Sequence, residues 1–156
     1  MASDLLRIGD EEGRKILISE CHDSSQPGID RMYAVTSLSR DFQDASCLEP
    51  VLDVLQANGD PKDYGIKEQA LNLTPSLITL VDHERAQRIF ELVTKSLYDP
   101  LPFLRITSAA TLERLGDTRA IPYLEPAITQ ETDDGCVHMM KLSLQALQNK
   151  ALSQRQ

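Results

Sequence analysis

The chain has 156 residues, of which 41% are hydrophobic and 26% are charged. A chain of this length can bury a core without disulfides or a structural metal. Its 24 acidic residues against 16 basic ones give a formal net charge of -8, which argues against nucleic acid or an anionic membrane as a partner. Aromatic residues make up only 4% and Trp is absent, so aliphatic side chains must fill the core, as suits helices better than a β-sandwich. We expect a protein partner that is neutral or basic.

The cysteines and the hydropathy of the chain indicate the cellular compartment in which it resides. Cys21, Cys47 and Cys136 are an odd number at wide spacings and form no C-x-x-C motif. No signal-like stretch opens the chain, and no apolar run approaches the roughly 20 residues that span a bilayer. These observations predict a reduced, cytoplasmic chain that does not associate with a membrane.

Two segments recur along the chain. Arg7–Asp10 returns as Arg114–Asp117 after 107 positions, and Leu48–Leu52 returns as Leu124–Ile128 after 76 positions. Taken as three periods and two periods, these offsets give repeats of about 36 and about 38 residues, the length of one helix pair. The sequence therefore predicts a stack of helix pairs.

In chain order, the apolar spacing divides the sequence into helix pairs and part-units within a single domain, 1–156. The first unit begins midway through a helix, and the last is a single helix. The predicted fold is all-α, an α-α superhelix of about nine helices. The approximate units are 1–26, 27–61, 62–100, 101–132 and 133–152.

The second and third units each end at a strong stop signal. Asn58–Pro61 closes the second, and Asp99–Pro100 closes the third. Pro75 falls inside the first helix of the third unit, where a proline removes a backbone donor and clashes with the preceding turn. We expect a kink or a break near Thr74.

The fourth unit has the clearest helix signals. Leu104, Ala109 and Leu112 lie on one apolar stripe, which ends at Gly116. Glycine is the usual residue at a helix C-terminus because it adopts a left-handed backbone, and the Asp117 side chain can cap the next helix. A helix, a tight turn and a second helix are predicted here.

The run from Arg105 to Ile128 resembles a known repeat. It carries an Arg, small residues, Leu-x-x-Leu-Gly-Asp and then Arg-Ala-Ile-Pro-x-Leu, the pattern of the HEAT-like repeat named for phycobilisome lyases. The start of the chain is similar to half of such a unit. The resemblance implies a HEAT-like solenoid and leaves function open, because similar repeats occur in bilin-lyase subunits, scaffolds, chaperone-like adaptors, a group of DNA glycosylases and a di-iron hydroxylase.

Candidate catalytic and ligand-binding residues must therefore distinguish among these functions. His83-Glu84 is similar to the His-Glu pairs of the hydroxylases, but one pair cannot hold two irons. Asp82 as a helix cap and Glu84 in the first turn account for the same triplet. A glycosylase would need a basic face and exposed aromatics, whereas Lys and Arg are scattered and Phe90 lies on a core stripe. We expect no metal and no nucleic-acid site.

No other local pattern indicates catalysis. Cys47 or Cys136 could serve as a nucleophile or a bilin-handling thiol, but neither has a neighbouring base, and both are explained as small buried residues. No Gly-rich loop precedes a Lys-Ser or Lys-Thr, so no nucleotide site is predicted. We expect no catalytic residue and no cofactor.

An acidic residue recurs on the second helix of successive units. Glu follows the equivalent core position at Leu48, Phe90 and Leu124, so the three glutamates could form an acidic ladder on the concave face, or could simply be a solvated face. The candidate partner-binding residues are Glu49, Asp53, Glu91, Lys95 and Glu125.

Together these patterns favour a non-catalytic scaffold or adaptor that binds a protein on the concave face of the helical stack. The alternative, implied by the resemblance alone, is a bilin lyase or a lyase-like subunit or chaperone that acts on a tetrapyrrole-carrying protein. A change in the visible absorbance of free bilin on mixing would favour the alternative.

Overall fold

The computed structural model describes residues 11–57 and 64–154. Over these residues the chain forms eight α-helices and three short 3-10 helices, with no strand, so the predicted all-α class is confirmed and the count is close to the nine expected. None of the described helices has both the length and the apolar composition that a membrane span requires. The predicted segments Arg7–Asp10 and Asn58–Pro61 lie outside the described residues.

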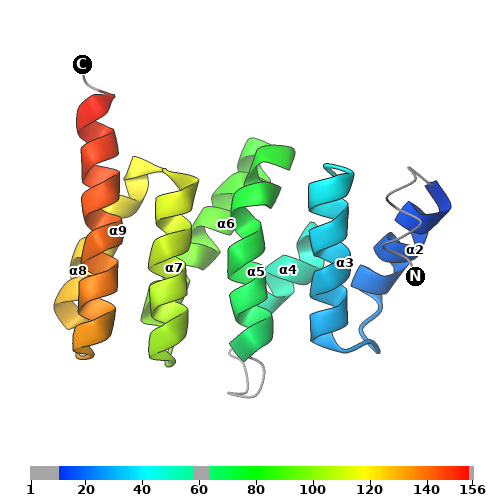
Figure 1. Ribbon diagram of the computed structural model, residues 1–156, viewed down its shortest axis with the longest axis horizontal. Helices are drawn as coiled ribbons and strands as arrows, with labels where there is room; N and C mark the ends of the chain where they lie inside the picture. The colour runs from blue at the N-terminus through cyan, green and yellow to red at the C-terminus, as the bar shows by residue number, and fades with distance from the viewer. Residues whose placement is uncertain (1–10, 58–63, 155–156) are drawn as a thin grey trace. The chain divides into compact units, whose positions relative to one another are not determined.

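The chain divides into two compact units, Met1–Ala86 and Gln87–Gln156. The first unit has two layers of helices, with α2, α3 and α5 side by side and α4 behind them (Figure 1). α3 packs against both α2 and α5, and α4 packs against α3 and α5. The elements are α2 (Glu11–His22), α3 (Gly28–Asp41), α4 (Leu48–Gln56), α5 (Tyr64–Leu77) and the 3-10 helix η2 (Ile78–Leu80).

Helix α5 continues through Pro75, so the break that was one of the two predicted outcomes near Thr74 is wrong, whereas the kink stays a prediction. A proline at this position cannot donate to the carbonyl oxygen of Leu71, four residues earlier. The hydroxyl of Thr74 donates to that oxygen at 2.8 Å. The buried Thr74 side chain thus replaces the hydrogen bond that Pro75 removes, and the α-helix ends three residues later, at η2.

The boundary between the units falls inside α6 (His83–Lys95), whose later turns open the second unit. In this unit α7 and α9 stand side by side, and α8 packs against α9 and against the 3-10 helix that follows α6 (Figure 1). The elements after α6 are η3 (Ser96–Tyr98), α7 (Pro102–Leu115), η4 (Thr118–Ala120), α8 (Ile121–Gln130) and α9 (Asp134–Ser153).

The turn between α7 and α8 forms as predicted. Gly116 adopts a left-handed backbone with φ of 63° and donates its N–H to the carbonyl oxygens of Leu112 and Glu113. Asp117 then caps η4, since its side chain accepts from the N–H of Arg119 at 3.0 Å. The end of α7 and the start of the next helix are therefore set by two adjacent residues.

Aliphatic side chains from the described α-helices of each unit fill its core, as the composition predicts. Leu38, Leu52 and Leu71 are fully buried in the first unit, and Leu112 and Leu124 in the second. Burying a Leu side chain contributes roughly 1.5 to 3 kcal/mol relative to leaving it exposed. The predicted core position Phe90 is also buried.

Candidate binding surface

All five predicted partner-binding residues are exposed. Glu49 and Asp53 lie on α4 in the first unit, whereas Glu91 and Lys95 on α6 and Glu125 on α8 lie in the second. The structure therefore brings the last three into one compact unit.

In the second unit, aromatic and cationic side chains join α6 to the start of α8. The rings of Phe90 and Tyr123 meet edge to face, with centroids 5.8 Å apart and planes at 80°. The guanidinium carbon of Arg119 lies 5.0 Å from the centroid of the Phe90 ring, within cation–π range. Phe90 is buried and Tyr123 is 47% exposed, so the buried Phe90 ring supports the half-exposed Tyr123 ring.

A chain of polar contacts runs along the same helices. Arg119 donates to Gln87 Oε1, and Gln87 Nε2 donates to Glu91 Oε1, each at 2.9 Å. The Arg119 guanidinium also donates to both carboxylate oxygens of Asp117, and this hydrogen bonding lowers the pKa of Asp117 and raises the pKa of Arg119. The contacts hold the Glu91 carboxylate on the α6 surface beside the aromatic pair.

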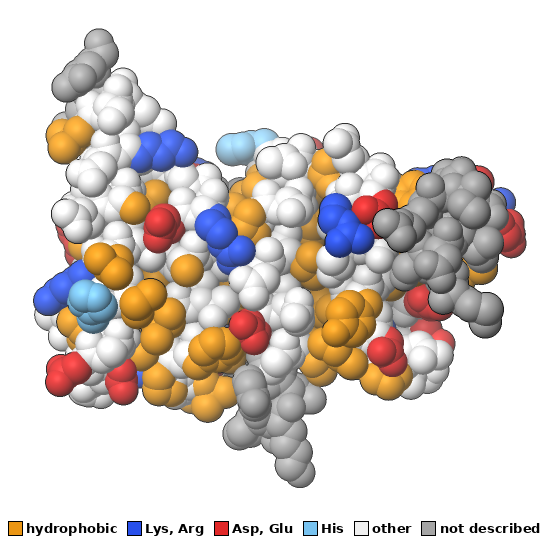
Figure 2. All heavy atoms as spheres, in the orientation of Figure 1, with side chains coloured by type: hydrophobic (Ala, Val, Ile, Leu, Met, Phe, Trp, Pro, Cys, Tyr) orange, Lys and Arg blue, Asp and Glu red, His pale blue; other side chains and the backbone are white. Residues whose placement is uncertain are grey.

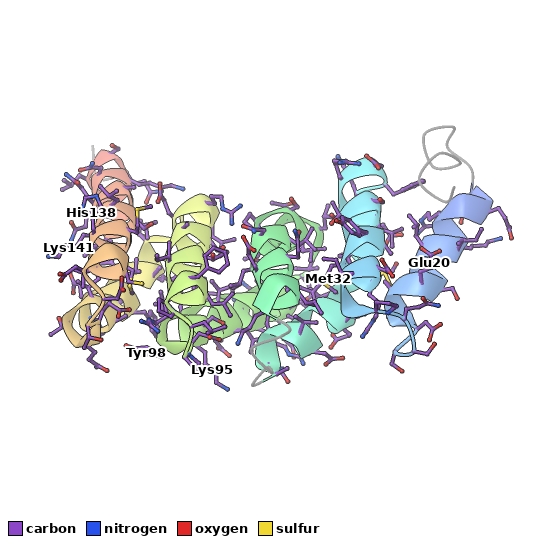
Figure 3. All side chains as sticks on the ribbon, turned by 60° about the horizontal axis from the view of Figure 1, so that its bottom comes forward. Glu20, Met32, Lys95, Tyr98, His138 and Lys141 are labelled. Carbon is purple, nitrogen blue, oxygen red and sulfur yellow. A yellow bond between two sulfur atoms is a disulfide. The ribbon has the colours of Figure 1, made fainter. Side chains whose placement is uncertain are left out.

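Lys95 and Tyr98 extend this surface to the end of α6 and into η3. Both are exposed, and Figure 3 shows them on the same side of the second unit. They are three positions apart along the helical chain, so their side chains are neighbours. Exposed tyrosines are enriched at protein interfaces because the ring contributes apolar area and the hydroxyl a hydrogen bond. We refer to Glu91, Lys95, Tyr98, Tyr123 and Glu125 as the α6/α8 surface.

Tyr98 also borders a hollow of about 320 Å³ between the η3–α7 connection and the end of α8. Its lining includes Arg105 and Glu131, which form a two-point ion pair: Nε donates at 2.5 Å and Nη2 at 2.8 Å to the two carboxylate oxygens. Hydrogen bonds from Arg105 lower the pKa of Glu131 from 4.5 to about 2, against the effect of burial. The pair keeps its charges at neutral pH and fixes the wall of the hollow.

The first unit has a second hollow of about 320 Å³, bordered by α2 and α3. Glu20 and Asp30 place two carboxylates in its lining, and Tyr33 is 62% exposed at its edge. Among the residues that the structure describes, no basic side chain lines this hollow, so it favours a neutral or cationic group. Sequence reasoning missed Tyr33, Tyr98 and Tyr123, although a tyrosine at a polar position of a helix was a signal that could have found them.

The other predicted sites have structural explanations. Asp82 Oδ1 accepts from the N–H of Arg85 at 2.9 Å, so it caps α6, and His83 and Glu84 occupy the first turn as predicted. Cys136 is buried, with Sγ 3.3 Å from the Pro102 carbonyl oxygen. Burial raises the pKa of the Cys136 thiol to about 11, so little thiolate forms at neutral pH.

The prediction of a fully reduced chain is wrong. Cys21, near the end of α2, forms a disulfide with Cys47, which directly precedes α4. One helix, α3, lies between the two cysteines in the sequence, and they form no motif, so the sequence gave no signal that they pair. The cytoplasmic location was inferred from reduced cysteines, and the disulfide removes that argument.

The two disulfide-bonded cysteines lie beside a histidine, although no metal site was predicted from the sequence. Cys21, Cys47 and His22 bring two sulfur atoms and a ring nitrogen within 4.8 Å of one another. The three residues come from α2 and from the segment before α4, so no single helix face carries them. Only folding assembles this group.

Comparison of the chain with protein-family models, with curated proteins and with solved structures gives no match. The similarity to HEAT-like repeats therefore stays a prediction from the residues themselves.

Proposed function

We propose that the protein is a non-catalytic binding module that engages a protein partner through the α6/α8 surface. The observation that carries the proposal is Tyr123, whose half-exposed ring rests edge-on against the buried ring of Phe90. A ring held in place before binding loses little conformational entropy on association. Such an aromatic anchor is typical of the residues that dominate interface energies.

The charged side chains around the anchor favour a neutral or basic partner. Glu91 and Glu125 are exposed on neighbouring helices, and the chain carries a net charge of -8. Charges at the rim of an interface act chiefly on the association rate and on its salt dependence. Tyrosine would supply affinity and the glutamates would steer the approach.

The proposal includes the finer architecture predicted from the sequence, a HEAT-like superhelix. Its support within the second unit is the α7–α8 helix pair, joined by the tight Gly116–Asp117 turn and followed by α9, which packs against both helices. Repeat stacks of this kind offer an extended surface built from many helices. The cytoplasmic location predicted from the sequence stays a proposal, and the Cys21–Cys47 disulfide argues against it.

A photoreactive amino acid at a chosen position tests the surface directly. Incorporated at Tyr98 or Tyr123 in cells, it should cross-link one discrete protein under ultraviolet light. Leu152, on α9 and 60% exposed, is the control position and should not give that product. Equal cross-linking from Leu152 would contradict the proposal.

A second measurement separates this function from handling of a tetrapyrrole. Free bilin mixed with the purified protein should show an unchanged visible spectrum. A saturable spectral change at stoichiometric protein would instead support a lyase-like role.

A further inference from the structure

We propose that Cys21, His22 and Cys47 form a zinc site that becomes available when the Cys21–Cys47 disulfide is reduced. Their ligand atoms already lie within 4.8 Å of one another in the disulfide form. Two thiolates and an imidazole are the ligand types that Zn²⁺ takes in proteins. The same residues would hold either a disulfide or a metal, so the redox state selects which.

The segment before α4 is anchored to α2 independently of the disulfide. Arg14 on α2 donates through Nε to Asp44 Oδ2 at 2.7 Å, and Asp44 Oδ1 accepts from the N–H of Ser46 at 2.7 Å. The N–H of Asp44 donates to the carbonyl oxygen of Leu38 at the end of α3, at 3.1 Å. These contacts hold Cys47 next to Cys21 after the sulfur–sulfur bond is broken.

Little rearrangement is needed to admit the metal. Tetrahedral Zn²⁺ with Zn–S bonds of about 2.3 Å requires its two sulfur atoms to stand about 3.8 Å apart. The Cα atoms of Cys21 and Cys47 are 6.0 Å apart, so rotation of the two side chains can open the sulfur atoms without moving the helices. Arg31 Nε donates to the carbonyl oxygen of Cys21 at 2.9 Å and so also fixes the backbone at the end of α2.

His22 can hydrogen-bond through one ring nitrogen and offer the other to a metal. Its Nε2 lies 3.1 Å from the carbonyl oxygen of Ser46, which can only accept, so in the tautomer that donates from Nε2 the lone pair of Nδ1 is left for the ion. Metal-binding histidines commonly donate their other N–H to a backbone carbonyl in this way. His22 is exposed whereas both cysteines are buried, so the ion reaches the sulfurs from the His22 side.

The redox step balances with a small dithiol as reductant. The dithiol gives two electrons and two protons: the Cys21–Cys47 bond breaks, two thiols form, and the dithiol closes into its own disulfide. Zn²⁺ then displaces the two thiol protons and binds both sulfurs and His22. Water completes the tetrahedral shell, because the protein supplies three ligands. A peroxide reverses the change: with two protons it takes two electrons from the thiolates, yielding the disulfide, free Zn²⁺ and two waters.

Cobalt substitution tests the site by spectroscopy. The full chain is reduced with a phosphine, which does not compete as a thiol ligand, and titrated with Co²⁺ alone. We expect one Co²⁺ per chain, with a near-ultraviolet thiolate-to-cobalt band and the visible bands of tetrahedral cobalt. Zn²⁺ should bleach both sets of bands, and peroxide should abolish them. The oxidised chain should show neither.

Matched variants assign the ligands. Cys47→Ser should abolish the thiolate band, and His22→Gln should weaken Co²⁺ binding about tenfold or more. Cys136→Ser and His138→Gln, which remove the buried free thiol and an exposed histidine of α9, should leave the titration unchanged. His22 is exposed, so its variant is expected to keep the wild-type helical signal, which circular dichroism checks.

Two results would overturn the proposal. One is a reduced wild-type chain, folded by circular dichroism, that binds no stoichiometric Co²⁺. The other is a titration by His22→Gln that is indistinguishable from that of the wild type.

Discussion

Arg105 and Glu131 form a largely buried ion pair in the second unit, with side chains 16% and 3% exposed. Arg105 lies on the first turn of α7, and Glu131 directly follows α8. Two further Arg105 hydrogen bonds reach the carbonyl oxygens of Asp99 and Pro100. One guanidinium therefore links the end of α8 to the connection between η3 and α7.

Acid should destabilise the protein partly through this pair. The folded-state pKa of Glu131 is lowered from 4.5 to about 2, so its contribution to stability is present above pH of about 4.5 and is lost as the pH falls toward about 2. Glu131→Gln should remove that part of the pH dependence. Thermal unfolding of both proteins between pH of about 7 and about 3 measures the difference, which should shrink as the pH falls.

Removal of the Arg105 guanidinium should destabilise the folded protein at neutral pH. Arg105→Ala leaves the buried Glu131 carboxylate without its charged donor and should lower the free energy of unfolding by about 2 kcal/mol. Arg40→Ala is the control, since Arg40 pairs with Asp41 at the surface and is 71% exposed. An exposed pair contributes about 0 to 1 kcal/mol, so equal losses in urea denaturation would contradict this account.

Leu124→Ala should lower the free energy of unfolding by roughly 2 to 5 kcal/mol, because it leaves a cavity at a fully buried position of α8. Leu152→Ala makes the same chemical change at a site that is 60% exposed and should stay within about 0.5 kcal/mol. Chemical denaturation measures both. Equal midpoints would show that Leu124 is not a core residue.

Two glycine substitutions should act in opposite directions. Gly116→Ala forces a side chain into the left-handed backbone at φ of 63° and against the end of the Lys150 side chain, and should destabilise by about 1 to 2 kcal/mol. Gly65→Ala, on α5, meets nothing within 4 Å and should stabilise by up to about 1 kcal/mol. Thermal unfolding of the two variants gives the sign of each change in stability. Changes of the same sign would contradict the helix ends described here.

Reduction of the Cys21–Cys47 disulfide, in the presence of a chelator, should lower the stability of the first unit by about 3.5 kcal/mol. This is the loop-closure value for its sequence separation of 26. The double variant Cys21→Ala, Cys47→Ala should unfold at the same denaturant concentration with and without reductant. If the wild type were equally insensitive to reductant, the disulfide would not stabilise the fold.

The acidic residues of the predicted ladder should govern association rather than stability. Reversal of Glu49, Glu91 and Glu125 to Lys should slow association with the partner. It should also make the association rate insensitive to ionic strength around the value at which the Debye length is about 8 Å. The control makes the same charge change at three exposed acids in first helical turns, Glu12, Glu84 and Asp134. Stopped-flow or biosensor kinetics compare the two triple variants. Identical association rates would show that the ladder is only a solvated face.

Figure 2 indicates a further apolar area on the second unit, where hydrophobic side chains gather over the lower halves of α7 and α9. Among the large hydrophobic side chains of these two helices, Phe103, Met139 and Leu142 are each between 42% and 46% exposed. They lie on α7 and α9 and so do not belong to the α6/α8 surface. This separation makes Leu142→Ser a useful control for any loss of binding by Tyr123→Ala.

Local chemistry in the sequence determined the helical class, the core positions and the ends of several helices. Gly116 and Asp117 act on backbone groups within four residues of themselves, so their roles follow from adjacent residues. Leu112 and Leu124 are buried because a helical period repeats the apolar face. The role of Thr74 was not predicted from the sequence. Its hydroxyl reaches the carbonyl oxygen of Leu71, and so compensates for Pro75, only when the chain is already helical there.

Only the tertiary structure decided which distant side chains meet. Cys21 and Cys47, Arg105 and Glu131, and Phe90 and Tyr123 are each separated by more than two dozen residues. Their encounters depend on how neighbouring helices cross and on which rotamers packing allows, and neither is encoded in a short window of sequence. The disulfide, the metal-ligand group and the rigid aromatic support of the α6/α8 surface therefore appear only once the helices have packed.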